Sequence, residues 1–115
     1  MDEKFDTLIA VNKYIVNLVV GIEKAVEYFQ AGDDKKGCEL ILPISEGIQW
    51  MSDALSVTKD IHKQDMKLVE MNGRLGQVVV ALENRDFILI GDLLQYELIP
   101  IIESIQKNIN SVLAN

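Results

Sequence analysis

The sequence predicts an all-α protein, an antiparallel up-down four-helix bundle that can also be described as two tandem helical hairpins. Three observations lead to this fold class. Apolar residues recur at spacings of three and four in four long segments, which is the period of an amphipathic helix. Only two prolines interrupt the chain. The links within each pair of segments are very short, and short links make neighbouring helices antiparallel.

The first two segments carry the most regular apolar pattern. The first ends at Gly32, which can cap a helix C-terminus, and Asp33 or Asp34 can start the second helix. The second pattern fades near Lys59, and a polar link follows over residues 57–63. The first stripe consists of Phe5, Leu8, Asn12, Ile15, Val19, Ile22, Val26 and Phe29, and the second of Ile41, Ile44, Ile48, Met51 and Leu55.

The third segment begins near Gln64 and stops before Asp86, which can cap the fourth helix. The apolar runs VVVAL and FILI could form strands, but they lie inside longer three-four patterns, which favour helix. The third stripe consists of Leu68, Asn72, Leu75, Val79 and Leu82, with Met71 and Val78 beside it. The fourth stripe consists of Phe87, Gly91, Leu94, Leu98, Ile101, Ile105 and Val112.

Both prolines lie in the second helix of a predicted hairpin. Pro100 lacks the N–H that would bond the Tyr96 carbonyl, and Pro43 lacks the one for the Glu39 carbonyl, so each helix should bend there. Two interpretations remain open at this point. The bend can wrap a helix around its core, or the freed carbonyl and a widened groove can form a docking place.

A shift of 53 residues aligns the first half of the sequence with the second. Two explanations remain open: an internal duplication, or the general similarity of any two amphipathic hairpins. The aligned pairs are Ile15 with Leu68, Ile22 with Leu75, Val26 with Val79, Phe29 with Leu82, Asp33 with Asp86, Leu40 with Leu93 and Ile48 with Ile101.

Length and charge limit the possible functions. A chain of 115 residues predicts one domain, 1–115, and the formal net charge of -7 repels phosphate groups. We therefore expect no nucleic-acid partner and no docking on anionic membranes. A single cysteine is typical of the reducing cytoplasm. Asn12, Lys13 and Asn17 interrupt the first apolar run, which argues against a signal peptide or a membrane span.

No set of residues predicts catalysis, so we expect a non-enzymatic protein with no metal and no cofactor. His62, the only histidine, lies in the polar link and lacks the Glu-x-x-His pattern of di-iron bundles. Cys38 follows Lys35 and Lys36 in the first turns of the second helix, which can lower the pKa of a thiol. Its apolar neighbours also fit a packing role. The sequence contains no glycine-rich phosphate loop.

More apolar residues are present than four narrow stripes can bury. Wider stripes can absorb them, or some remain exposed as an interface. Tyr28, Trp50 and Tyr96 lie off the stripes and are the possible interface residues, because aromatics are enriched at interface cores. We expect a protein–protein interaction module that forms a homodimer or binds a partner helix. An alternative is a small-ligand binder or enzyme with a pocket near Pro100.

Two stretches, AVEYFQAGDDKKGCELILPISEGIQWMSDAL and ALENRDFILIGDLLQYELIPIIESI, are similar to a family of short uncharacterised helical proteins of Firmicutes bacteria. The shared features are the Gly-Asp turn, the Gly-Ile-Gln-Trp stretch and the Asp-Leu-Leu-x-Tyr-Glu-Leu-x-Pro phrase. The resemblance covers most of the chain and brings no assigned activity. The helix, Gly-Asp turn and helix are more loosely similar to flagellin-export chaperones, which are helical bundles that bind a partner's helices. A flagellar or secretion-type chaperone or adaptor is therefore a further alternative.

Overall fold

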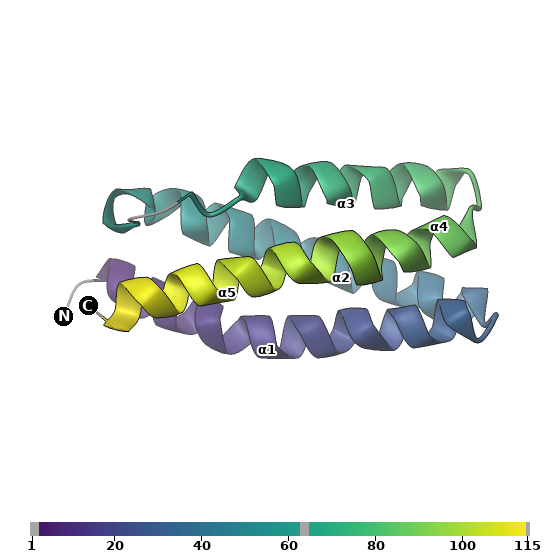
Figure 1. The fold of residues 1–115 in the computed structure, drawn as a ribbon, viewed down its shortest axis with the longest axis horizontal. Helices are drawn as coiled ribbons and strands as arrows, with labels where there is room; N and C mark the ends of the chain where they lie inside the picture. Colours follow the sequence, from purple (N-terminus) through teal and green to yellow (C-terminus); the bar gives the residue numbers. More distant parts are fainter. Residues whose placement is uncertain (1–2, 63–64, 115) are drawn as a thin grey trace.

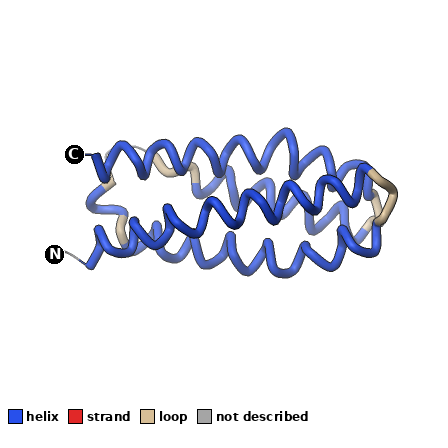
Figure 2. The backbone as a smooth tube through the Cα atoms, turned by 90° about the horizontal axis from the view of Figure 1, so that it is seen from below, coloured by secondary structure: helices blue, strands red, loops and turns tan. Residues whose placement is uncertain are grey.

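The computed structural model of the protein describes residues 3–62 and 65–114, and these residues form helices and no strand. The all-α prediction is confirmed, and VVVAL and FILI are helical. Figures 1 and 2 show the helices lying side by side as antiparallel rods. The longest extent of the molecule is 47 Å. The elements are α1 (Glu3–Gln30), α2 (Asp34–Val57), a short 3₁₀ turn η1 (Lys59–Ile61), α3 (Leu68–Glu83), α4 (Phe87–Asp92), the π-helical η2 (Leu93–Leu98) and α5 (Ile99–Ala114).

The elements α4, η2 and α5 follow one another as a single continuous rod, called here the fourth rod (Figure 1). Helix α1 packs against α2 on one side and against the fourth rod on the other. Helix α3 packs against α2 and the fourth rod. Both chain ends and the α2–α3 link lie at one end of the bundle, and two tight turns lie at the other (Figure 1). The first hairpin is thus α1 with α2, and the second is α3 with the fourth rod.

The predicted aspartate caps are present at both tight turns. The Asp33 carboxylate accepts a hydrogen bond from the backbone N–H of Lys36 at 3.3 Å. The Asp86 carboxylate accepts one from the N–H of Leu89 at 3.2 Å. Each carboxylate satisfies a donor that the first turn of a helix leaves without an intrahelical partner.

The two tight turns are equivalent in geometry. Gly32 has a φ of +77° and Arg85, 53 positions later, a φ of +57°, so both lie in the left-handed region. Each of four backbone N–H to C=O hydrogen bonds in the first turn has an equivalent in the second turn, 53 residues later. They join Ala31 to Glu27, Gly32 to Phe29, Asp33 to Tyr28 and Gly37 to Asp33 in the first turn, and Asn84 to Val80, Arg85 to Leu82, Asp86 to Ala81 and Ile90 to Asp86 in the second.

The first hairpin buries most of its predicted stripes. All five predicted stripe residues of α2 are buried. In α1, Asn12 and Val19 lie at the edge of the core, and the Asn12 side-chain amide donates to the Asn110 side-chain oxygen of α5 at 2.9 Å. That bond gives the polar member of the stripe a partner across the helix interface. The buried residues of α1 are Leu8, Val11, Ile15, Leu18, Ile22, Ala25, Val26 and Phe29.

Helix α3 departs from the prediction. It begins at Leu68, and the predicted start at Gln64 lies outside the described residues. The predicted stripe is rotated, because Asn72 and Val79 are exposed, and the buried residues of α3 are Met71, Val78 and Ala81. The Asn72 amide nevertheless reaches α2, where it donates to the Ser52 hydroxyl oxygen at 3.0 Å.

The fourth rod contains a π-helical turn just before Pro100. The Ile99 N–H donates to the Leu94 carbonyl, five residues back, so this turn holds more residues than an α-helical turn. The inward face therefore advances by four residues twice in succession, from Leu94 to Leu98 and then to Ile102. The prediction that Ile101 continues the buried stripe is wrong, because Ile101 is only partly buried. By contrast, α2 continues through Pro43 as α-helix.

By length and composition alone, α1 qualifies as a candidate membrane span among the described residues. A core helix of a soluble protein and a signal sequence pass the same test, so this is weak support for a span. In the bundle the buried stripe of α1 contacts α2 and the fourth rod.

Candidate functional site

Helix α3 carries a second stripe, opposite to the one that enters the core. Val69, Gly73, Gly76 and Val80 recur at spacings of four, three and four, which places them on one face of the helix. Val69 and Val80 are exposed, and a Cβ atom added to either glycine would meet no other atom within 4 Å. This outward face of α3 is therefore apolar, and no side chain projects from it at the two glycines.

An open groove runs along this face, between α3 and the start of the fourth rod. Leu89 and Leu93 form its far wall, and the two glycines widen it because they lack side chains. Its volume is about 590 Å³. We call it the α3–α4 groove, and the residues that line it are Gly73, Gly76, Gln77, Val80, Ala81, Asn84, Asp86, Leu89 and Leu93.

Charged groups lie only at the margins of the α3–α4 groove. Asp86, at the turn, is the one ionisable side chain among the nine lining residues. Farther along, Arg74 of α3 bridges to Glu97 of η2, with Nε and Oε2 at 3.4 Å. The Arg74 guanidinium also donates to the Gln77 side-chain oxygen at 3.3 Å. The groove thus combines an apolar floor with one carboxylate at its turn end.

Of the three predicted interface residues, Trp50 lies on α2 beside α1. Its ring packs edge-on against Tyr14, with the centroids 5.1 Å apart. The Tyr14 hydroxyl lies over Gly47, where an added Cβ would come within 2.0 Å of it. The Trp50 side chain remains 44% exposed and lines a shallow surface hollow with exposed Pro43. The Trp50 ring is therefore partly covered by Tyr14 and partly exposed to solvent.

Tyr28 and Tyr96 occupy other places. Tyr28 is half-buried on α1, under the Lys36 ammonium, which lies 5.8 Å from its ring centroid. Tyr96 lies on η2 and is 67% exposed. Its sequence neighbours reach different helices, since Gln95 bonds to Gln30 of α1 and Glu97 to Arg74 of α3. The ring contacts among the described residues do not join the three predicted aromatics to one another.

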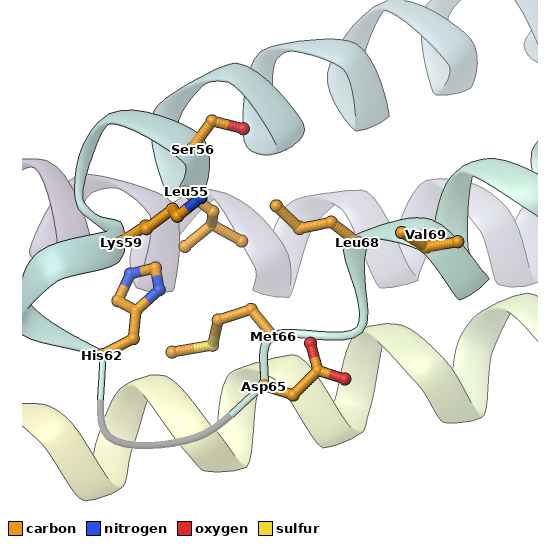
Figure 3. A pocket seen from close by; sticks show the side chains of 8 residues that line it. All are labelled: Leu55, Ser56, Lys59, His62, Asp65, Met66, Leu68 and Val69. Atoms are coloured by element: carbon orange, nitrogen blue, oxygen red, sulfur yellow. The ribbon is translucent and has the colours of Figure 1, made fainter.

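A second cavity, of about 510 Å³, is lined by residues from the end of α2, the following link and the start of α3 (Figure 3). The His62 ring and the Met66 side chain point into it. The buried Thr58 hydroxyl lies 3.1 Å from the Ala54 carbonyl oxygen and shares a hydrogen bond of 2.8 Å with the His62 Nε2 atom. Burial lowers the pKa of the His62 imidazole, and the Asp60 carboxylate opposes that shift. The neutral ring is therefore favoured.

The polar groups around this second cavity mainly hold the α2–α3 link in place. Lys4 of α1 pairs with Asp60, and the Asn108 side chain of α5 donates to the Asp65 carbonyl at 3.2 Å. Met66 is buried and closes the end of the core. His62, Asp60 and Asp65 thus connect the α2–α3 link to the C-cap of α2, to α1 and to α5, respectively.

The remaining sequence candidates lie apart from both sites. Burial raises the pKa of the Cys38 thiol, and Asp34 adds to the effect while Arg85 opposes it. That direction is opposite to the lowering suggested by its lysine neighbours. Pro100 is exposed and lines neither cavity. Within residues 3–62 and 65–114, no three His, Cys, Asp or Glu side chains are grouped so that they could hold a metal ion. The absence of a resident metal stays a prediction.

The sequence pattern contained a signal for the α3–α4 groove that the stripe assignment missed. Two apolar stripes of the same period run along α3. The sequence predicts that the stripe with the larger side chains faces the core. The outward stripe contains Gly73 and Gly76, which a search for large apolar residues passes over. Glycine is unfavourable in the interior of a helix, so the two glycines are the sequence signal for this outward stripe.

The groove and most of both hairpins lie within a segment that matches a protein family. The profile of one protein family matches residues 6–108, which span most of α1 through most of α5. No curated protein and no solved structure matches the chain. The predicted resemblance to an uncharacterised helical family is therefore confirmed, and the likeness to flagellin-export chaperones receives no support from these comparisons. The chain belongs to the family described as domain of unknown function DUF8042.

Proposed function

We propose that the protein is a non-enzymatic interaction module that receives a helix of a partner protein in the α3–α4 groove. One observation carries the proposal: an open groove of about 590 Å³ has an apolar floor widened by two glycines. An amphipathic helix that enters such a groove buries its own apolar face there. Exposed Val69 and Val80 extend the same surface along α3.

The chemistry of the groove favours a macromolecular partner over a small molecule or a substrate. Small-molecule sites place several polar groups around an enclosed ligand. Here Asp86 is the only ionisable lining residue, and no nucleophile or histidine lies beside it. Exposed apolar surface next to small residues instead suits the close approach of another helix. The single cysteine favours a cytoplasmic location for this role.

Val80→Glu should abolish partner binding and leave the bundle folded, because Val80 is 54% exposed and forms one wall of the groove. A buried unpaired carboxylate opposes any apolar partner surface. The test is affinity purification of tagged protein from its native cells, with co-purifying proteins quantified. Val16→Glu is the matched control, since Val16 is 55% exposed on α1, outside the groove.

The expected result is a set of proteins retained by the wild type and by Val16→Glu and lost from Val80→Glu. Circular dichroism should show the same helicity for all three. Equal retention by both variants would show that the groove is not the binding surface.

Self-association is a second candidate, favoured by Trp50, whose 44% exposed side chain lines a shallow surface hollow together with exposed Pro43. A two-fold dimer covers such a patch with one surface from each copy. Sedimentation equilibrium at micromolar concentration should then give a dimer mass, and Trp50→Glu should give a monomer of unchanged helicity. A monomer mass for the wild type would exclude the homodimer and leave the groove proposal standing.

A further inference from the structure

The two hairpins can be compared position by position, because their turns match bond for bond at an offset of 53 residues. The nine positions that line the α3–α4 groove therefore have nine counterparts in the first hairpin. Five of these counterparts are charged, against one in the groove. The counterparts are Val20, Glu23, Lys24, Glu27, Tyr28, Ala31, Asp33, Lys36 and Leu40.

Three of these counterparts form a contact set in the first hairpin. The Lys36 ammonium lies 5.8 Å from the centroid of the Tyr28 ring, within range of a cation–π interaction. The same ammonium lies 3.8 Å from an Asp33 carboxylate oxygen. An aromatic ring, a cation and a carboxylate thus cover this side of the first hairpin.

The second hairpin keeps only the carboxylate. Ala81 takes the position of the tyrosine and Leu89 the position of the lysine, while Asp86 takes that of the aspartate. Asp86 caps α4 as Asp33 caps α2, yet no basic side chain is paired with it among the described residues. The second hairpin thus lacks the ring and the cation of the first, and has the buried Ala81 and the partly exposed Leu89 at their positions.

We propose that the groove takes a basic segment of a partner protein that places an aromatic side chain against Val80 and Leu89 and a lysine or arginine beside Asp86. This proposal rests on the proposed function and names the class of partner. The apolar walls of Leu89 and Val80 accept the ring. Asp86 and the net charge of -7 attract the cation.

A second copy of the chain fits this site poorly. Its exposed aromatics are flanked by carboxylates, since Trp50 has Glu46 and Asp53 on the same helix face, and Tyr96 has Asp92. Either ring would bring negative charge toward Asp86. Charge complementarity therefore disfavours self-association at the groove through Trp50 or Tyr96.

The probe is a blocked alanine-based helical peptide of about fifteen residues, long enough to form a helix. It carries one tyrosine and a lysine four positions later, which places both side chains on one face. Two control peptides replace the tyrosine by alanine or the lysine by glutamate. Backbone amide shifts of the full-length protein, followed by NMR during titration, report where and how tightly each peptide binds.

Binding of the tyrosine–lysine peptide should move the amides of Gly73, Gly76 and Leu89 and should saturate. Loss of the tyrosine should weaken binding about tenfold or more, as for a buried aromatic anchor. Replacement of the lysine should weaken it about two- to fivefold, the range of a partly exposed ion pair.

The protein variants Asp86→Asn and Asp33→Asn separate the charge from the cap, because asparagine caps a helix as well as aspartate does. Asp86→Asn should erase the preference for lysine over glutamate in the peptide. Asp33→Asn, at the equivalent turn, should leave that preference intact.

Two outcomes would overturn the inference: equal binding by the peptide without tyrosine, or a lysine preference that survives Asp86→Asn. Equal binding of all three peptides at the groove amides would leave the helix-binding function standing. Absence of any shift at these amides would also overturn the inference, whereas the proposed function is decided separately by retention of native partners in Val80→Glu.

Discussion

Replacement of Ile102 by alanine should lower the free energy of unfolding by about 2–5 kcal/mol, the range for truncation of a buried isoleucine. Ile102 is fully buried, because the π-helical turn before Pro100 rotates it into the core. The adjacent Ile101 is only partly buried, so Ile101→Ala should cost about 1 kcal/mol. Urea unfolding followed by circular dichroism measures both changes.

The pair of variants tests the register of the fourth rod. A regular α-helix through Leu94 and Leu98 would point Ile101 inward, since the stripe would then advance by three residues. Ile101→Ala would in that case be the costlier change. Equal or reversed costs for the two isoleucines would contradict the π-helical turn.

Gly37→Ala should destabilise the protein by about 1–2 kcal/mol, although alanine is the better helix former. An added Cβ would lie 2.7 Å from the Phe29 ring, and that ring is buried and stacked on Phe87 with centroids 6.4 Å apart. The ring has little room to retreat, so the overpacking cost of about 1–3 kcal/mol exceeds the gain in helix propensity of up to about 1 kcal/mol.

Gly21→Ala is the matched control for this prediction. Gly21 lies inside α1, and an added Cβ would meet nothing within 4 Å. The substitution should therefore raise the free energy of unfolding by up to about 1 kcal/mol. A stabilising effect of Gly37→Ala in the same urea experiment would show that the Phe29 ring moves aside.

The helices and their ends were predictable from the sequence because the forces that set them are local. The three-four periodicity of α2 depends only on neighbouring turns, and all five of its predicted stripe residues are buried. The caps at Asp33 and Asp86 need only a carboxylate three residues before a free N–H. The short turns then made the hairpins antiparallel.

The tertiary structure decided which of two stripes faces the core. Helix α3 has two apolar stripes of equal period, and periodicity ranks them only by the size of their side chains. Packing against α2 and the fourth rod buried Met71 and Val78 and left Gly73 and Gly76 outside. The groove exists because that choice also placed Leu89 opposite the glycines, a relation between two helices that no single helix contains.

By itself, the sequence determined the helical class and the caps of α2 and α4. The sequence did not determine which residues after Pro100 face the core. Proline lacks the N–H of a helical hydrogen bond, but its presence does not specify whether the neighbouring turn is α-helical or π-helical. The sequence also could not place Tyr28, Trp50 and Tyr96 relative to one another. Their separation follows from the rotation of each helix about its axis, which is set by the summed packing of all four rods.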